Sequence, residues 1–255
     1  MIQSIYQGGL GNQLFQIATG YALARDNDDE YYMNVNLHLG KGQGHHIKEY
    51  SSSIFKNIPE TNIVYDNLYK EPLFSHTPIQ YSKNLKLDGY FQSEKYFPQY
   101  KNQLNKLFGF DAPQYYTGLC GIQIRTGDYL YSPNFNIVTP QYVKNAMDIV
   151  KSQHPSIKFL VITDDKELAQ RYLPQSEIYD YASNYHTDQD VDSVKSVNDL
   201  HMMSRCDFCI MSNSTYGWWG SYLGKSKTTI VPDRWFNNDF NTSDVYRSDM
   251  IKISV

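Results

Sequence analysis

A regular alternation of strand-like and helix-like segments after residue 118 constrains the fold more than any other feature of this sequence. Helical patterns separate five apolar runs, which read LCGIQIR, IKFLVITDD, EIYDY, DFCIMS and TTIVP. Strands and helices that alternate at this spacing predict a mainly parallel sheet covered by helices on both faces. The first of these helices has Thr139 as its predicted cap and Pro140 in its first turn. The second half of the chain is therefore expected to be an α/β unit.

The first half of the chain is less regular. It opens with a strand, a glycine turn and a helix, in the segments IQSIYQ, GGLGN and QLFQIATGYALAR. Residues 26–84 are predicted to be mostly loops, and residues 85–97 a strand, a turn at Asp88-Gly89 and a short helix led by Ser93. Pro98 and Pro113 bracket a segment that is expected to act as a hinge between two lobes.

Composition narrows the class of protein. A chain of 255 residues can bury a large core, and a net charge of -4 does not suit a protein that wraps a nucleic-acid backbone. No apolar run reaches the roughly 20 residues that cross a bilayer, and the first residues show no secretory signal, so a cytoplasmic location is expected. The cysteines of CDFC, Cys206 and Cys209, have redox or metal spacing, but core packing is the favoured interpretation.

Polar residues follow three of the predicted strands. Arg125 and Asp128 follow IQI, Thr163 and Asp164 end the next strand, and the run 212–215 follows DFCIM. Because ligands of such sheets bind beyond the carboxyl ends of the strands, these residues are predicted to share one site. Asn213, Ser214 and Thr215 open a helix, whose free N–H groups favour an anion, and an arginine fork could hold the other side of a diphosphate. An ion pair between Arg125 and Asp128 is the equal alternative.

Other cofactor sites are less favoured by the sequence. The motif GGLGNQ fits neither the dinucleotide fingerprint nor a Walker loop, although the acidic residues 28–30 lie where a ribose-binding carboxylate would. Asp164 and Asp165 could hold Mg²⁺ or Mn²⁺ beside a diphosphate, but Asp165 could equally cap the next helix. The 23 tyrosines suit sugar recognition and core packing alike.

Six segments in this order resemble the bacterial-type α-1,2-fucosyltransferases of glycosyltransferase family 11. They read GGLGNQLFQIATGYALA, LDGYFQSEKYF, IRTGDY, VITDD, DLHMMSRCDFCIMSNSTYGWWGSYLG and VPDRWF, and they extend over about residues 6–236. The resemblance implies a GT-B-type fold of two Rossmann-like lobes with mainly parallel sheets and a cleft between them. Residues 1–115 would form the acceptor-side lobe with the Gly-rich loop, and residues 116–255 the lobe that binds the nucleotide sugar.

The resemblance also implies roles for individual residues. Arg125 would contact the β-phosphate of GDP, and Asp199 would read the guanine edge. Asn213, Ser214 and Thr215 would bind phosphate, with Thr163, Asp164 and Gln123 nearby. The loop facing the donor sugar would consist of Gly9, Gly11, Asn12 and Gln13. The expected activity is metal-independent, inverting transfer of fucose from GDP-fucose to galactose O2 of a glycan, with Asp128 as the residue that orients or deprotonates the acceptor hydroxyl.

The chain departs from the family signature His-x-Arg-Arg-x-Asp at two positions. Gln123 replaces the histidine and Thr126 replaces the second arginine. Gln123 cannot act as a base, and the loss of an arginine removes a charge-assisted contact worth roughly 1.5–3 kcal/mol. These changes leave two alternatives open: a different nucleotide-sugar donor and a carbohydrate-binding protein without activity. Separately, an enzyme that acts on lipid-linked glycans could associate peripherally with a membrane without a spanning helix.

Overall fold

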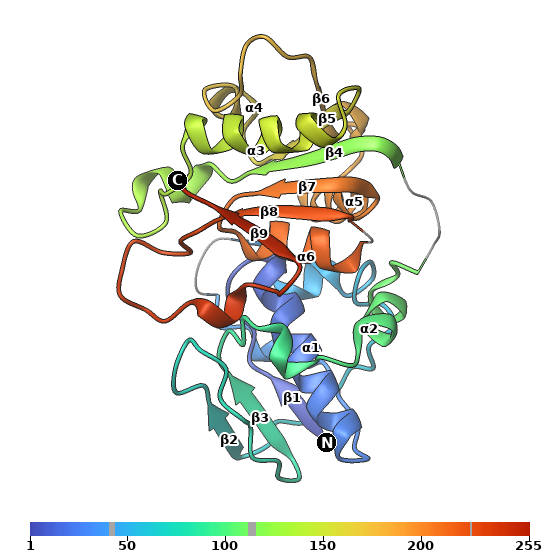
Figure 1. The fold of residues 1–255 in the computed structure, drawn as a ribbon. Helices are drawn as coiled ribbons and strands as arrows, with labels where there is room; N and C mark the ends of the chain where they lie inside the picture. The colour runs from blue at the N-terminus through green and yellow to red at the C-terminus, as the bar shows by residue number, and fades with distance from the viewer. Residues whose placement is uncertain (41–43, 112–115, 225) are drawn as a thin grey trace. The chain divides into compact units, whose positions relative to one another are not determined.

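The computed structural model describes residues 1–40, 44–111, 116–224 and 226–255, and the chain divides into two compact units. The first unit consists of Met1–Asp111 and Asn241–Arg247, and the second of Ala112–Phe240 and Ser248–Val255. The short segment 241–247 therefore belongs with the N-terminal unit, although the sequence assigns it to the C-terminal lobe. Figure 1 labels the helices and strands of both units.

The first unit is built on a three-stranded parallel sheet with the order β1-β3-β2. Its strands are β1 (Ile2–Ser4), β2 (Asn67–Lys70) and β3 (Leu85–Asp88), and its helices are α1 (Leu10–Asp26) and α2 (Lys101–Phe108). Single helical turns lie at η1 (Val35–Leu37), η2 (Ile47–Tyr50), η3 (Glu94–Tyr96) and η6 (Ser243–Val245). Helix α1 is buried nearly all round, including the polar side chains of Gln13 and Gln16. Those buried amides need partners inside the unit.

One prediction for the first unit was wrong. Helix α1 begins at Leu10, with Gly9 as its cap, so the GGLGN segment is largely the first turn of the helix and not a turn before it. Helix α2, which was not predicted, occupies much of the segment between Pro98 and Pro113, whose last two residues lie outside the described residues, and a hinge there stays a prediction. The Ser93 cap is confirmed, because its side chain accepts a hydrogen bond from Lys95 N.

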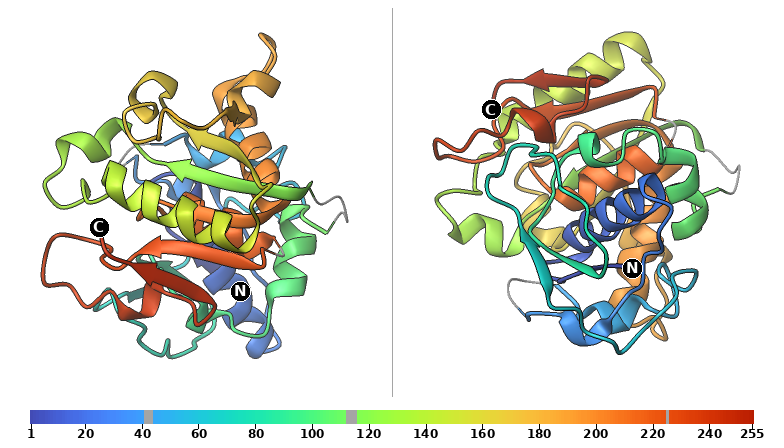
Figure 2. Two further views of the ribbon diagram at one scale, coloured as in Figure 1. Left: turned by 45° about the horizontal axis from the view of Figure 1, so that its top comes forward. Right: turned by 90° about the horizontal axis from the view of Figure 1, so that it is seen from below.

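The second unit is a six-stranded parallel sheet with the order β6-β5-β4-β7-β8-β9. Helix α3 packs on one side of this sheet, and α5 and α6 pack on the other (Figures 1 and 2). Side chains of α3 and of the central strands form the apolar core of the unit. The strands are β4 (Tyr116–Ile124), β5 (Lys158–Thr163), β6 (Tyr179–Tyr181), β7 (Cys206–Met211), β8 (Thr228–Pro232) and β9 (Met250–Ile253). The helices are α3 (Pro140–Gln153), α4 (Lys166–Ala169), α5 (Asp192–Ser204) and α6 (Thr215–Leu223), with single turns at η4 (Gly127–Tyr131) and η5 (Ala182–Tyr185).

The predicted parallel sheet is confirmed, with one omission. TTIVP is not the last strand, because β9 follows it and pairs in parallel with β8. Thr139 caps α3 by accepting from Tyr142 N, and Pro140 is the first residue of that helix. All three cysteines are buried and free, which confirms core packing for Cys206 and Cys209. Among the described residues, no helix is both long enough and apolar enough to cross a membrane.

Candidate functional site

Arg125 follows the last residue of β4 and lies between two carboxylates of the same unit. Its Nη2 donates to Asp128 Oδ1 at 2.7 Å, and its Nη1 lies 3.0 Å from Asp164 Oδ2. The three side chains keep similar exposed fractions, 27% for Arg125, 28% for Asp128 and 26% for Asp164. The ion pair expected as the alternative for Arg125 is therefore present, and the group remains accessible to a charged ligand.

Asp164 also fixes the turn that carries Arg125. Its Oδ1 accepts from the backbone N–H of Thr126 at 2.8 Å and from the Thr126 hydroxyl at 2.6 Å. Gly127 follows with a φ of +41°, and a Cβ there would lie 2.7 Å from Asp164 Oδ2. Glycine is required at this position both by its backbone conformation and by the close approach of the carboxylate. Thr126, which replaces the expected second arginine, is thus a buried partner of Asp164.

The residues after β7 are held mainly by backbone contacts. Asn213 Nδ2 donates to the carbonyls of Phe135 and Trp235, at 3.1 and 2.9 Å. Ser214 occupies the cap position of α6 without a capping hydrogen bond from its side chain, and Thr215 begins the helix. The amides of this first turn are therefore not satisfied by the Ser214 hydroxyl. The Asn213 Nδ2 group thus braces the loop, and the phosphate contact that the resemblance implies for Asn213 stays a prediction.

Gln123 and Thr163 lie at the ends of neighbouring strands, and their side chains bind backbone groups of the same unit. Gln123 is buried, and its Oε1 accepts from Ser212 N at 3.2 Å. The Thr163 hydroxyl accepts from Asp165 N at 3.2 Å. Asp165 caps α4 by accepting from Leu168 N, which confirms the capping interpretation of that carboxylate. The structure thus places these residues as supports for the site formed by Arg125, Asp128 and Asp164.

Asp199 lies on α5 and is nearly buried. Its Oδ1 lies 2.6 Å from His186 Nε2, on the segment that precedes the helix. Burial raises the pKa of the Asp199 carboxyl, and the contact with His186 opposes that shift. The pairing with His186 was not predicted, because two residues separated by a loop show no periodic pattern in the sequence.

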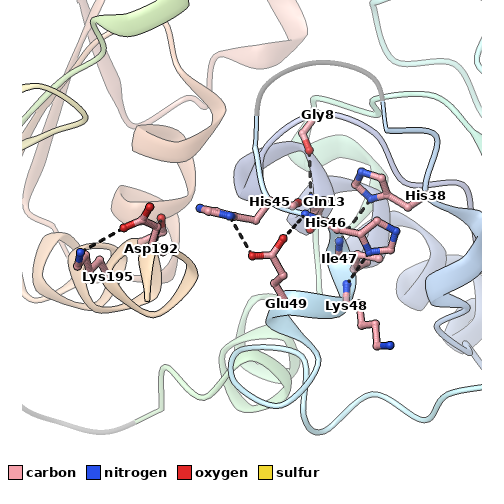
Figure 3. Close-up of polar contacts among 11 residues, drawn as sticks. Gly8, Gln13, His38, His45, His46, Ile47, Lys48, Glu49, Asp192 and Lys195 are labelled. Carbon is pink, nitrogen blue, oxygen red and sulfur yellow. Dashed lines mark hydrogen bonds and ion pairs between the residues drawn. The ribbon is translucent and has the colours of Figure 1, made fainter. Parts of the chain in front are cut away.

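In the first unit, the predicted glycine motif becomes the start of α1. Gly9 is the cap residue, and Gly11, Asn12 and Gln13 lie in the first turn. Gln13 is fully buried, and its Nε2 donates to the carbonyls of Gly8 and His45, at 3.0 and 2.9 Å (Figure 3). Its Oε1 is also buried and has no hydrogen-bond partner among the residues that the structure describes. The structure therefore makes Gln13 a brace between two loops of this unit.

The segment after His45 is itself ordered by local contacts. His45 Nδ1 lies 3.0 Å from Glu49 Oε2, and His46 caps η2 by accepting from Lys48 N (Figure 3). The ring of His46 packs on that of His38 with centroids 4.3 Å apart. Burial and the neighbouring His46 lower the pKa of His38. These contacts order the segment beside the His45 carbonyl that Gln13 binds.

Asn12 points to a second polar group that the sequence analysis missed. Its Oδ1 accepts from Gln92 Nε2 at 2.9 Å, while Gln16 Nε2 donates to the carbonyls of Gln7 and Gly89 at 3.2 Å. Gln92 lies in the segment FQSEKYF, which was part of the resemblance but received no role. The glutamines that make these contacts are buried in the structure. In the sequence, the available signal was their position close to glycines.

Comparison with known proteins identifies the family. The model of glycosyl transferase family 11 matches residues 54–254, which is most of the chain. The protein belongs to glycosyl transferase family 11. It is therefore a glycosyltransferase, and the alternative of a binding protein without catalytic activity is set aside.

Individual relatives agree with this family-11 assignment. The chain is 24% identical to the Alpha-1,2-colitosyltransferase of Escherichia coli, with 91% of each chain covered. It is 25% identical to the Galactoside 2-alpha-L-fucosyltransferase of Caenorhabditis elegans, over 99% of this chain and 76% of that protein. The crystal structure of NodZ alpha-1,6-fucosyltransferase soaked with GDP-fucose is similar in fold, with a TM-score of 0.50, 12% identity and coverage of 93% and 97%. The family-11 protein thus has the predicted GT-B-type fold.

The described part of the enzyme offers no group of three or more His, Cys, Asp or Glu side chains that could hold a metal ion. Of the two carboxylates predicted as a possible metal site, Asp165 caps a helix and Asp164 binds Thr126 and Arg125.

Proposed function

We propose that this enzyme transfers fucose from GDP-fucose to a hydroxyl group of a glycan, galactose O2, with inversion at the fucose anomeric carbon. The observation that carries the proposal is Arg125, a partly exposed guanidinium at a strand end, whose backbone N–H donates to Ser212 Oγ in the loop that leads to α6. A guanidinium can hold two phosphate oxygens at once, and a helix N-terminus favours negative charge. The relatives named as fucosyltransferases support fucose as the sugar.

The nucleotide diphosphate replaces a carboxylate on Arg125 when it binds. The side chains of Arg125, Asp128 and Asp164 carry a summed formal charge of -1. A negatively charged diphosphate would therefore be repelled unless one carboxylate moved away from Arg125. Asp164 is held by two hydrogen bonds from Thr126, whereas Asp128 bonds only to Arg125 among the residues that the structure describes. Asp128 is therefore the carboxylate that the diphosphate displaces from Arg125.

Release from Arg125 gives Asp128 its role in the reaction. The bond between the anomeric carbon of fucose and the phosphate oxygen breaks, and GDP leaves with the electron pair. Arg125 and the first-turn amides of α6 stabilise the negative charge that develops on the diphosphate. The acceptor oxygen attacks the opposite face of the anomeric carbon, and its proton passes to the freed Asp128 carboxylate.

The proposal assigns binding of the donor sugar to residues of the first unit. Asn12 and the cap residue Gly9 lie at the start of α1, where amide groups can bind sugar hydroxyls without adding charge. Asp199 reads the guanine base, and Asn213, Ser214 and Gln123 hold the loop that faces the phosphates.

A second donor is favoured by one observation, the similarity to the Alpha-1,2-colitosyltransferase over 91% of each chain. Colitose would then replace fucose on the same nucleotide, with the same inversion and the same acceptor position. Thr126 in place of the second arginine is the sequence feature that could accompany such a change.

The experiment is a donor panel with the purified enzyme. Release of GDP is followed with GDP-fucose, GDP-colitose, GDP-mannose and UDP-galactose, with a β-galactoside as acceptor, and the product linkage is read by NMR. We expect turnover with GDP-fucose and an α-1,2 linkage. Turnover with GDP-colitose alone would establish the second candidate, and turnover only with the UDP sugar would contradict both.

A further inference from the structure

Glu71 is a partly buried carboxylate in the first unit that no part of the proposed mechanism uses. It follows β2, and its backbone N–H donates to Asp88 O at 2.8 Å, which extends the pairing with β3. Its side chain accepts from Tyr90 N at 2.7 Å and from Phe91 N at 3.0 and 3.1 Å. These amides belong to the turn after β3 and lie outside the sheet ladder. The Glu71 carboxylate therefore binds the turn after β3, and only the Glu71 backbone pairs with the sheet.

The turn that Glu71 holds is strained. Phe91 has a φ of +52°, which is uncommon for a residue other than glycine and is disfavoured for a bulky side chain. The Phe91 ring is fully buried and packs edge-on against Tyr96, with centroids 5.4 Å apart. A Cβ at Gly89 would lie 2.4 Å from Glu71 Cβ, so only glycine lets the carboxylate approach. Strain of this kind persists only where the surroundings over-determine it, and it is concentrated at functional sites.

The strained turn leads directly to the start of α1. Gln92, the next residue, is nearly buried and donates through Nε2 to Asn12 Oδ1 at 2.9 Å. Gln16 attaches the carbonyl of Gly89 to the same helix at 3.2 Å. The Gln92 Oε1 is buried and has no partner in the described part of the chain. The orientation of Asn12 thus depends on a side chain whose backbone Glu71 fixes.

We propose that Glu71 is a positioning residue for sugar transfer, which clamps the 89–91 turn so that Gln92 orients the Asn12 amide at the start of α1. The inference rests on the proposed function, in which Asn12 lies on the sugar side of the site. Glu71 touches neither substrate nor reacting atoms. Its effect is carried by two hydrogen bonds to the turn and one from Gln92 to Asn12.

The charge on Glu71 is held at a cost, which argues against a role in stability alone. Burial raises the pKa of Glu71, the amides of Phe91 and Tyr90 and the hydroxyl of Tyr96 oppose the shift, and the nearby Asp88 adds to it. A neutral side chain would avoid this desolvation penalty if the position only had to support the sheet. The Phe91 N–H, however, contacts both carboxylate oxygens, and a glutamine would turn its NH₂ donor toward this N–H or toward that of Tyr90.

The test compares steady-state kinetics of Glu71→Gln, Gln92→Ala and Asn12→Ala with those of the wild-type enzyme. We expect Glu71→Gln to lower kcat by between about tenfold and a hundredfold, with the KM for GDP-fucose and the Kd for GDP changed by no more than about twofold. Gln92→Ala should produce the same split, and Glu71→Asp should recover part of kcat. Glu71 and Gln92 act in one chain of contacts. The kcat of the double variant Glu71→Gln/Gln92→Ala should therefore be no lower than that of the slower single variant. Glu60→Gln, an exposed glutamate of the same unit, is the matched control.

The variants separate the failures. If Asn12→Ala lowers kcat and Glu71→Gln and Gln92→Ala leave it unchanged, the positioning role is wrong while the proposed function stands. If Asn12→Ala leaves kcat unchanged, the sugar-side assignment fails and the positioning role fails with it. If Glu71→Gln does not fold, Gln92→Ala decides the question, because it removes only the contact with Asn12, and an unchanged kcat overturns the inference.

Discussion

The two units differ in the charge and the exposure of their polar groups. In the first unit the start of α1 is surrounded by neutral amides, and Gln13, Gln16 and Gln92 are all buried. In the second unit the group around Arg125 is charged, and each of its three side chains keeps about a quarter of its surface exposed. Buried neutral amides form a rigid frame with few accessible atoms, whereas exposed charges can exchange partners when a ligand arrives.

This difference matches the two halves of a nucleotide sugar. A diphosphate carries charge and is best held by a guanidinium and helix-end amides, while a sugar offers hydroxyl groups that neutral amides can bind. The comparison therefore predicts that substitutions of the nucleotide-binding residues Arg125 and Asp199 weaken nucleotide affinity, and that substitutions of the base Asp128 and of the first unit lower the rate of transfer. The predictions below test that division, beginning with the largest expected effect.

Arg125→Ala should lower kcat/KM for GDP-fucose by about a thousandfold, because it removes the charged contacts to the diphosphate and leaves Asp128 and Asp164 to repel it. Steady-state kinetics measure the effect, with Arg171→Ala, an exposed arginine of the same unit, as control. Near-native transfer by Arg125→Ala would remove the basis of the proposed function.

Asp128→Asn should lower kcat by about a hundredfold, the usual contribution of a general base. The Kd for GDP should stay the same or fall, since the variant removes a competitor for Arg125. Calorimetric titration with GDP and single-turnover kinetics separate the two effects. A kcat within about twofold of wild type would show that Asp128 only neutralises Arg125.

Asp199→Asn should weaken binding of GDP by about tenfold and that of inosine diphosphate by less, because both bases offer N1–H to the carboxylate and only guanine adds the exocyclic amine. The ratio of the two Kd values is the measurement. If wild type and variant discriminate the two nucleotides equally, Asp199 serves only His186.

Thr126→Val should lower the free energy of unfolding by about 1–3 kcal/mol, since the partly exposed Asp164 carboxylate loses the buried hydroxyl that its Oδ1 binds at 2.6 Å. Chemical denaturation measures this change. A variant that is as stable as wild type would mean that the backbone N–H of Thr126 alone satisfies the carboxylate.

Asp244→Asn should have the smallest effect, below about 1 kcal/mol of unfolding free energy, because its ion pair with Lys95 is partly exposed. The hydrogen bond from Lys95 lowers the pKa of Asp244. The stabilisation is therefore full above the ordinary aspartate pKa and is lost as pH falls through the lowered value. The difference between wild type and variant should shrink in acid, and a difference that grows in acid would contradict this sign.

The sequence predicted the second unit better than the first, for physical reasons. Buried parallel strands and capped helices leave periodic patterns, so the sheet and the cap at Thr139 were found. Strand β9 was missed because its middle residues are exposed and its apolar pattern is weak. Helix α2 was missed because two prolines flank it, and both suggested a break.

The sequence predicted which residues lie together at the candidate site, but it did not predict most of the contacts between them. Strand ends brought Arg125, Asp128 and Asp164 together as expected, because neighbouring parallel strands end at one edge. The bond between Thr126 and Asp164 and the clamp of Glu71 on the 89–91 turn depend on pairs far apart in the sequence. Single-sequence periodicity carries no information about such pairs.

Hydrogen–deuterium exchange of the intact enzyme with and without GDP tests the central claim most directly, the claim that the nucleotide binds at the Arg125 group of the second unit. The account predicts slower exchange in residues 125–131 and 212–218 and no change in residues 8–16, with protection of residues 8–16 appearing only when GDP-fucose is added. Protection of residues 8–16 by GDP, with residues 125–131 unaffected, would contradict it.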